Sequence, residues 1–270
     1  GVVKMIQDIF PHIFKNEYHP KKPKENDYVF SFSQNFVTVK KDHSFFKYQD
    51  LLEDNTEFIY LFEIDDTAFF LCNEIKETHD TISVKTMRTY LPQELAFACI
   101  TGWQLYDWMK NNQYCGRCST PTVRDTKERA MRCPKCGNVI YPKLSPAVIV
   151  CIINAKKEIL ITHYSSSFYT HDALVAGYAE IGETIEETVH REVKEETGLN
   201  VKNLVYYKSQ PWSFSQTLLF GFFCEVDGDD TIHMDQNELK YAAWHKTSDT
   251  FDLPDTASLT AEMIHYIKSK

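Results

Sequence analysis

Residues 177–199 read GYAEIGETIEETVHREVKEETGL, and this order predicts a helix with recognisable ends. Thr184 and Glu187, three residues apart, form a capping box, in which each side chain accepts a hydrogen bond from the other residue's backbone N–H. Gly198 follows the last periodic residue and suits the left-handed position that ends a helix. We therefore expect a helix over about residues 185–197.

The glutamates of this helix border its apolar side. At about 100° per residue, an apolar stripe is formed by Ile185, Val189 and Val193. Glu196 falls about 20° from the centre of that stripe, Glu192 about 60° and Glu195 about 120°. A charge-rich surface helix would place its glutamates opposite the stripe, because an unpaired carboxylate at a buried face is costly. A hard divalent cation, held by oxygens at positions i, i+3 and i+4, is the natural compensation.

The glycines and charges together resemble a known motif. The motif consists of Gly177, Glu183 and the run Arg191-Glu192-Val193-Lys194-Glu195-Glu196-Thr197-Gly198-Leu199. It is similar to the complete Nudix box, and the resemblance implies an enzyme that hydrolyses a nucleoside diphosphate linked to another moiety with Mg²⁺ or Mn²⁺. In that chemistry the metal neutralises the pyrophosphate oxygens and lowers the pKa of bound water.

The resemblance also implies roles for individual residues. Glu192 and Glu196 are the leading metal ligands, and Glu195 is a third ligand or orients the water. Arg191 is expected to pair with Glu183 and to hold the junction between the loop and the helix. Downstream, Glu238, followed by Ala242-Ala243-Trp244, resembles the glutamate that completes the metal site.

Four of the eight cysteines form two closely spaced pairs, Cys115-x2-Cys118 and Cys133-x2-Cys136. This spacing is typical of a zinc ribbon, in which four thiolates close a tetrahedral shell and leave no open position for chemistry. We therefore expect one structural zinc, with a disulfide framework and a redox pair as the alternatives. We expect nearby basic residues to keep the sulfurs ionised, namely Arg117, Arg132 and Lys135. Cys72, Cys99, Cys151 and Cys224 lie in apolar runs and are predicted to be buried.

Two further features resemble the NADH pyrophosphatase (NudC-type) branch of the Nudix hydrolases. A four-cysteine ribbon directly precedes the Nudix-like part, and the string Ser209-Gln210-Pro211-Trp212 resembles the start of the branch signature SQPWPFPxS. Three positions depart from that signature, where Ser213, Ser215 and Thr217 replace Pro, Pro and Ser. We expect the loop there to be less stiff than in the branch.

The resemblance implies a set of substrate-binding residues. Tyr178 and Tyr141 occupy positions of base-stacking aromatics, and Tyr141 is contributed across the interface of a homodimer. The other candidates are Ser209, Gln210, Pro211, Trp212 and Phe214. For any one of these aromatics, ordinary core packing stays open as an alternative.

The pattern of the chain predicts an α+β protein. We expect a β-rich α+β domain over residues 1–110, in which Asp65-Asp66 is a turn between antiparallel strands and a helix covers 92–110. A zinc ribbon is expected over 111–141. The resemblance implies that residues 142–270 form a Nudix α/β/α sandwich with a mixed sheet. Its strands are expected at 147–153, 158–163, near 176, 203–209, 217–226 and 241–246, and its last helix at 259–268.

The composition restricts the partners. The formal net charge of the 270 residues is −9, which argues weakly against gripping bare nucleic acid. A local basic patch remains available to guide RNA, made of Arg117, Arg124, Lys127, Arg129 and Arg132. No apolar run approaches the roughly 20 residues of a membrane span, and residues 1–14 lack a secretory pattern, so we expect a cytoplasmic protein.

The resulting prediction is hydrolysis of the pyrophosphate bond of NADH or NAD⁺ to nicotinamide mononucleotide, reduced or oxidised, and AMP. Removal of NAD caps from RNA 5′ ends is the same cleavage, and the two substrates stay open at this stage. One alternative is hydrolysis of ADP-ribose or a diadenosine polyphosphate. An alternative of another class is a non-catalytic regulator that binds a nucleotide or nucleic acid.

Overall fold

A computed structural model of the chain describes residues 4–51, 57–165, 171–253 and 257–270. The chain divides into two compact units. One contains Asp8–Lys143, and the other contains Leu144–Lys270 together with the described residues before Asp8. In the described parts of the chain, no helix is long and apolar enough to cross a membrane.

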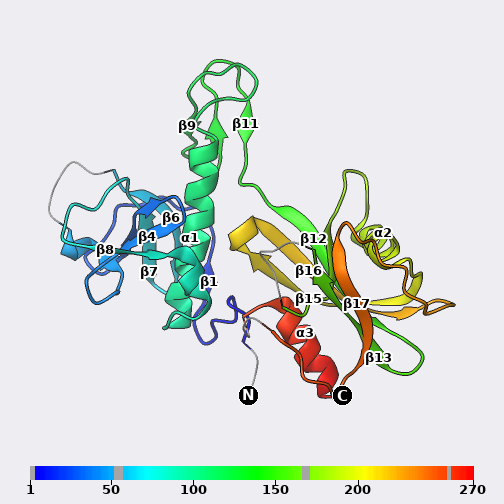
Figure 1. The fold of residues 1–270 in the computed structure, drawn as a ribbon. Coiled ribbons are helices and arrows are strands. Elements are labelled where there is room, and N and C mark those ends of the chain that lie inside the picture. The colour runs from blue at the N-terminus through cyan, green and yellow to red at the C-terminus, as the bar shows by residue number, and fades with distance from the viewer. Residues whose placement is uncertain (1–3, 52–56, 166–170, 254–256) are drawn as a thin grey trace. The chain divides into compact units, whose positions relative to one another are not determined.

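Besides the cysteine-bearing segment, the described part of the first unit contains two small sheets and one long helix (Figure 1). Its larger sheet has the order β1 (Phe14–Lys15), β6 (Ile59–Ile64), β7 (Thr67–Leu71), β2 (Tyr28–Phe30) and β5 (Phe46–Lys47). The smaller sheet joins β3 (Phe32–Ser33), β4 (Phe36–Val39) and β8 (Asp80–Ser83). Short 3-10 turns cover Tyr48–Asp50 and Val84–Arg88.

Two expectations for this unit are confirmed. β6 and β7 are antiparallel around the turn at Asp65, whose φ is 54°, and α1 covers Gln93–Asn111 with Pro92 as its N-cap. One pairing was not anticipated from the sequence, because β2 pairs with β7 in parallel. The two strands lie far apart in sequence, so no hairpin constrains their direction.

The cysteine-bearing segment forms a three-stranded antiparallel sheet in the order β11 (Val139–Ile140), β10 (Met131–Arg132) and β9 (Val123–Arg124). Tyr114 and Pro121 form an isolated bridge beside it. These strands are very short, so the sheet alone buries little apolar surface and needs another source of stability.

The second unit is built on a six-stranded mixed sheet (Figure 1). Its order is β15 (Val201–Trp212), β16 (Thr217–Val226), β12 (Ser145–Ile153), β13 (Glu158–Tyr164) and β17 (Leu239–Lys246), and β14 (Val175–Tyr178) also pairs with β12. β12 and β16 are parallel, whereas the other pairs are antiparallel.

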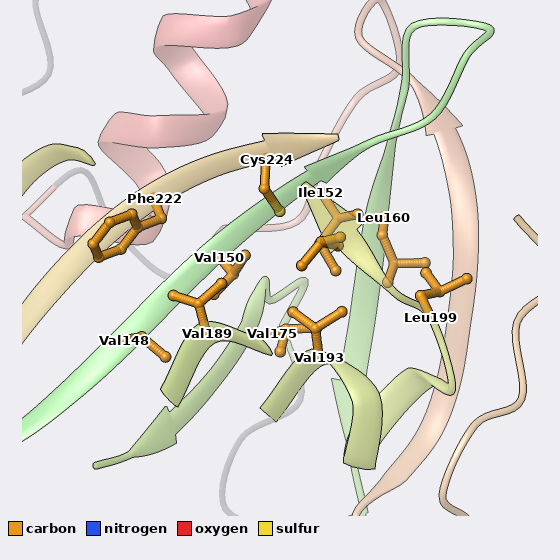
Figure 2. Packing of buried hydrophobic residues seen from close by; sticks show 11 residues of the cluster. Val148, Val150, Ile152, Leu160, Val175, Val189, Val193, Leu199, Phe222 and Cys224 are labelled. Carbon is orange, nitrogen blue, oxygen red and sulfur yellow. The ribbon is translucent and has the colours of Figure 1, made fainter. Parts of the chain in front are cut away.

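Helices α2 (Ile185–Thr197) and α3 (Leu259–Lys268) cover opposite faces of this sheet. On one face Val148, Val150 and Ile152 of β12 pack against Val189 and Val193 of α2 (Figure 2). On the other face, the alternate residues of β12 pack against α3. A strand covered on both faces is apolar throughout, which explains the unbroken run from 147 to 153. The predicted three-layer sandwich with a mixed sheet is confirmed.

β15 is longer than the expected strand at 203–209. It continues through Ser209, Gln210, Pro211 and Trp212, which pair with residues 217–220 of β16. β15 is an edge strand, and an edge strand tolerates a proline whose missing N–H would face away from the sheet. The signature string is therefore the end of a strand, and only the 3-10 turn Ser213–Ser215 separates it from β16.

Gln210 joins three parts of this unit and is fully buried. Its amide nitrogen donates to the side-chain oxygen of Gln7 at 3.1 Å and to the carbonyl of Ala257 at 2.8 Å. Its oxygen accepts from the backbone N–H of Leu259 at 2.7 Å, one of the N–H groups that a helix N-terminus leaves without an intrahelical partner. These contacts hold the first residues of α3 and the segment around Gln7 on the sheet.

We predict that Gln210→Leu lowers the free energy of unfolding by about 3 kcal/mol, because buried backbone groups at 257 and 259 lose their partners. Urea denaturation of both proteins measures the difference. Gln236→Leu, the same change at an exposed glutamine, should lie within about 0.5 kcal/mol of wild type. Equal stability of the wild type and Gln210→Leu would contradict the role assigned to this amide.

Candidate functional site

Helix α2 begins and ends as its sequence predicts. The side chain of Thr184 accepts from the N–H of Glu187, and the Glu187 carboxylate accepts from the N–H of Thr184 at 2.7 Å. Gly198 ends the helix with φ 73°, a left-handed conformation that favours glycine. Val189 and Val193 are fully buried, so the rotation of the helix about its axis is fixed by packing.

This rotation sets the exposure of the three glutamates. Glu196 is 1% exposed and Glu192 9%, while the side chain of Glu195 is 59% exposed. The order is the one that the helical wheel predicts. Two carboxylates therefore lie at the buried face of α2, and a third lies at its rim.

Three successive backbone positions of β14 meet these residues. The N–H of Ala176 hydrogen-bonds to Glu196. A Cβ placed on Gly177 would lie 1.9 Å from the carboxylate carbon of Glu192. Any residue other than glycine at position 177 would therefore displace the Glu192 side chain. The carbonyl of Tyr178 accepts from Arg191 at 2.9 Å.

Arg191 connects the carboxylates at the exposed side of the site. It donates to Glu183 at 2.5 and 2.9 Å, to Glu192 at 2.7 Å and to Glu195 at 2.9 Å. The pairing with Glu183 that the resemblance implied is present. The hydrogen bonds from Arg191 hold the pKa of Glu183 at about 2, so Glu183 is ionised at neutral pH. Thr188 and the N–H of Glu180 bind the same carboxylate at 3.0 and 2.9 Å.

Glu196 has no comparable compensation. Its Oε2 atom is buried without a hydrogen-bond partner in the described structure. Burial, followed by the charges of Glu192 and Glu238, raises the pKa of Glu196 to about 8. Burial also raises the pKa of Glu192, despite its contact with Arg191.

Glu238 reaches this group from the chain between β16 and β17. The N–H of Asp235 donates to the carbonyl of Glu196 at 3.0 Å, and the N–H of Glu238 donates to the carbonyl of Asp235 at 3.2 Å. The segment is thus fixed to the end of α2. The charge of Glu238 raises the pKa of both Glu192 and Glu196, which places the three carboxylates in one field.

The donor set fits a hard divalent cation. Carboxylate oxygens are the ligands that Mg²⁺ and Mn²⁺ prefer, and the unpartnered Glu196 carboxylate is exposed to the charges of Glu192 and Glu238. Among the described residues, however, only the four ribbon cysteines already hold their ligand atoms within 4.8 Å of one another. The carboxylates would therefore move closer together when they bind a cation.

Aromatic and hydroxyl groups gather at the end of the sheet where β14 and β15 end and β16 begins. Tyr178 is 51% exposed, and its hydroxyl lies 3.2 Å from that of Thr217. Trp212 and Phe214 pack edge to face, with ring centroids 5.0 Å apart. Ser209 and Pro211 are half-buried on the same strand end as Trp212. The structure thus brings five of the expected aromatic and strand-end positions to one end of the sheet.

Of the two remaining expected substrate-binding residues, one is used within the protein and the other belongs to the other compact unit. Gln210 points into the protein, and both its donors and its oxygen are used by residues 7, 257 and 259, so no part of it faces a ligand. Tyr141 belongs to the other compact unit, where it is exposed and its hydroxyl donates to Glu128 at 3.2 Å.

Sequence reasoning missed three contributors to the site: the N–H of Ala176, and the hydroxyls of Thr188 and Thr217. A backbone donor leaves no trace in the residue type. Thr188 directly precedes the buried Val189, and a polar residue at that position was the available signal. For Thr217 the signal was its departure from the signature.

The four ribbon cysteines converge. The sulfurs of Cys115 and Cys136 are 3.6 Å apart, those of Cys118 and Cys133 are 3.5 Å apart, and all four lie within 4.8 Å of one another. Zn–S bonds of about 2.3 Å in a tetrahedron separate the sulfurs by similar distances. The cluster therefore fits a structural zinc, and among the described residues every cysteine is free of a disulfide.

The expected source of sulfur ionisation is wrong. Hydrogen bonds from the side chain and backbone of Thr120 lower the pKa of Cys118 to about 6, and the backbone N–H of Arg117 leads the lowering of the pKa of Cys115. Arg132 is engaged elsewhere, with Asp125 at 2.7 Å and Glu128 at 3.3 Å. The backbone of each Cys-x2-Cys turn supplies hydrogen-bond donors to the sulfurs, so basic side chains are not needed to lower the pKa of Cys115 and Cys118.

Most side chains of the expected basic patch are engaged in ion pairs and hydrogen bonds within the chain. Arg124 pairs with Glu57, and Arg129 donates to the carbonyls of Leu61 and Asn16 at 2.5 and 3.2 Å. Together with the pairs of Arg132, these contacts occupy three of its five cations. Little of the patch is left to neutralise phosphates.

Comparisons with known proteins match the cysteine-bearing segment and the C-terminal part of the chain separately. A model of the NUDIX domain matches residues 143–267, and a model of the NADH pyrophosphatase zinc ribbon domain matches residues 110–141. The chain is 37% identical over 163 residues to the NAD-capped RNA hydrolase NudC of Citrobacter koseri, covering 60% of this chain and 63% of that protein. It is 32% identical over 179 residues to the protein of that name from Haemophilus influenzae, covering 65% and 67%.

Among solved structures, a NUDIX hydrolase from Nitrosomonas europaea aligns with a TM-score of 0.48 and 16% identity, over 58% of this chain and 92% of that chain. The chain spans less than two thirds of the length of the Citrobacter koseri protein.

We predict that the stability of the metal-free protein falls as the pH rises from about 5 to about 8. Folding raises the pKa of Glu196 from 4.5 to about 8. Below pH 4.5 the carboxyl is neutral in both the folded and the unfolded protein. Between the two pKa values it ionises freely only in the unfolded protein, so rising pH favours unfolding. The loss approaches about 1.4 kcal/mol per pH unit within this window. It is measured by urea denaturation in EDTA.

Glu196→Gln should remove most of this slope, and saturating Mg²⁺ should flatten it in the wild type. Glu186→Gln, an exposed change on the same helix, should leave it in place. A wild-type stability that does not vary between pH 5 and 8 would contradict the uncompensated burial of Glu196.

We also predict about one zinc ion per chain, measured by elemental analysis of purified protein. Cys118→Ala should lose this zinc, because three thiolates no longer close the shell. Cys72→Ala, a buried thiol outside the cluster, should keep it. A wild-type protein that contains no zinc, even after refolding with the metal, would refute the assignment.

Proposed function

The chain belongs to the Nudix hydrolase family, in the branch that carries an NADH pyrophosphatase zinc ribbon, and on this premise we propose that it hydrolyses the pyrophosphate bond of NADH and NAD⁺. The products are nicotinamide mononucleotide, reduced or oxidised, and AMP. The observation that carries the proposal is the buried, unpartnered carboxylate oxygen of Glu196, whose pKa is raised by burial and by the charges of Glu192 and Glu238. Such a group is stable as an anion only with a cation.

The catalytic cation is proposed to be Mg²⁺ or Mn²⁺, held by Glu192, Glu196 and Glu238, with Glu195 as a further ligand or as the residue that orients water. When bound, it neutralises the diphosphate and lowers the pKa of bound water. Gly177 supports this arrangement because it leaves room for the carboxylate of Glu192. Ala176 supports it because its backbone N–H donates a hydrogen bond to Glu196.

Arg191 is proposed to act by orientation. Its contacts with Glu183 and with the carbonyl of Tyr178 fix the guanidinium, which in turn holds Glu192 and Glu195 at the rim of the site. Loss of Arg191 would free four groups at once. We therefore assign Glu183 and Arg191 to the catalytic machinery as residues that position the ligands.

The base of the substrate is proposed to stack on Tyr178, with Trp212 and Phe214 beside it and Ser209 and Pro211 in the adjacent wall. The half-exposed ring of Tyr178 and the gathering of these groups at one end of the sheet support this assignment. We withdraw Gln210 from the substrate-binding set, because its amide is used by the protein.

We also propose a homodimer in which Tyr141 reaches the site of the second copy, an arrangement that the exposure of Tyr141 supports. The division into residues 1–110, 111–141 and 142–270 remains our proposal for the domains, supported by the two matched ranges. The free thiols of the described cysteines suit a reducing compartment such as the cytoplasm.

NAD-capped RNA is a second proposed substrate, since its cleavage is the same reaction and the relatives bear that name. Because three of the five basic residues near the ribbon pair within the chain, we expect the free dinucleotide to be recognised without help from an RNA tail.

The test compares turnover of NADH, NAD⁺, ADP-ribose, diadenosine tetraphosphate and NAD-capped RNA with Mg²⁺ or Mn²⁺. Glu192→Gln and Glu196→Gln should each lower kcat by at least about 100-fold, because a ligand of the metal is lost. Glu186→Gln, which removes the same charge from the exposed face of α2, should keep full activity. Chromatographic detection of AMP and nicotinamide mononucleotide identifies the bond that is cut.

Two outcomes would overturn the proposal separately. If ADP-ribose or the diadenosine compound were much the best substrate, the assignment to NADH and NAD⁺ would fail. If Glu196→Gln kept wild-type activity, the proposed metal site would fail. A wild type that binds these nucleotides but hydrolyses none of them would favour a non-catalytic regulator.

A further inference from the structure

Tyr178 is held at both of its polar ends. Its carbonyl accepts from Arg191 at 2.9 Å, and its hydroxyl lies 3.2 Å from Oγ1 of Thr217. The residue as a whole is 51% exposed. The residue therefore presents an accessible aromatic face whose backbone and tip are both fixed.

The hydroxyl of Thr217 uses its full hydrogen-bonding capacity. A threonine hydroxyl offers one donor and two acceptor positions. The Oγ1 atom donates to the carbonyl of Ser215 at 3.2 Å, and it lies 2.7 Å from the hydroxyl of Ser215 and 3.2 Å from that of Tyr178. In the contacts with the hydroxyls of Ser215 and Tyr178, either oxygen can be the donor.

The turn that carries these hydroxyls is itself anchored. Gln216 adopts a left-handed conformation with φ 56°, and its carbonyl accepts from the N–H of Ser145 at the start of β12. Thr217 is buried and begins β16, directly opposite Trp212 in the ladder. The hydrogen-bond partner of the Tyr178 hydroxyl is therefore part of the sheet, and its position does not depend on a flexible side chain.

We propose that Thr217 is a positioning residue, which fixes the ring of Tyr178 as a platform for the aromatic base of the dinucleotide through a single hydroxyl–hydroxyl bond. This inference rests on the proposed function, because it assumes that a base stacks on Tyr178. A ring already held in its stacking position loses less conformational freedom when the substrate binds. Loss of the bond therefore weakens binding and leaves the chemical step unchanged.

The same bond suggests a structural role for the residues that depart from the branch signature. With Ser213 and Ser215 in place of two prolines, the turn lacks the stiffness that proline supplies. Ser215 binds Thr217 through both its carbonyl and its hydroxyl, and Thr217 binds Tyr178. Hydrogen bonds between side chains thus replace fixed backbone angles as the means of holding the turn and the ring together.

The test measures KM and kcat for NADH in Tyr178→Phe, Thr217→Val, Thr217→Ser and the double variant Tyr178→Phe/Thr217→Val. Each change that removes the bond should raise KM about fivefold, the worth of one net hydrogen bond, at unchanged kcat. Thr217→Ser keeps the hydroxyl and should stay within about twofold of wild type. Tyr206→Phe, at another tyrosine that is 51% exposed, should have no effect.

The double variant decides whether the two residues act through one bond. Its KM should equal that of either single variant, because each change removes the same interaction. Independent, multiplied effects would overturn the inference, as would wild-type KM values for Tyr178→Phe and Thr217→Val. A fall in kcat at constant KM would also overturn it. Tyr178→Phe alters a half-exposed ring, so the test survives even if Thr217→Val fails to fold.

The proposed function can fail separately. If the wild type hydrolyses none of the dinucleotides, that function is wrong, and the bond is then examined by AMP binding, followed through tryptophan fluorescence. Weaker AMP binding in both Tyr178→Phe and Thr217→Val would support the positioning role. Equal affinity of the wild type and both variants would overturn it.

Discussion

The contact between strand β14 and helix α2 organises the C-terminal unit. At three successive positions β14 supplies what the helix needs: an N–H at Ala176, an empty Cβ position at Gly177 and a carbonyl at Tyr178. Because β14 pairs with the central strand β12, these three backbone positions are held in place by the sheet. The glutamates are thus positioned by backbone atoms, which a substitution elsewhere in the chain does not easily displace.

This contact also explains how an acidic protein would handle the diphosphate of the proposed substrate. Packing of Val189 and Val193 turns Glu196 into the interior, where its ionised form is costly without a cation. The fold accepts that cost because the valines, the capping box and Gly198 hold the helix in place regardless of the charge. Part of the net charge of −9 is therefore concentrated where it attracts metal, and the metal makes the site attractive to phosphate.

Sequence reasoning succeeded where the determinants are local. The ends of α2, the burial order of its glutamates and the convergence of the cysteines all follow from spacings of two to four residues. It failed where the partner is distant in the chain. Gln210 was read as part of a substrate-binding string, but its partners are at 7, 257 and 259, and Arg124 and Arg129 find theirs near residue 60. A residue type does not show which of its hydrogen bonds the fold will use.

The departures from the branch signature belong to the same argument. Prolines would stiffen the turn after β15 through its own backbone, independently of the residue at 178. Serine and threonine stiffen it only through partners, and the partner of Thr217 is the hydroxyl of Tyr178. The hydroxyl at 217 and the tyrosine at 178 are thus a matched pair, although 39 residues separate them. Because Arg191 holds the other end of Tyr178, the bond joins the turn at the proposed base-binding end to the carboxylates of α2, and one residue links the two halves of the proposed site.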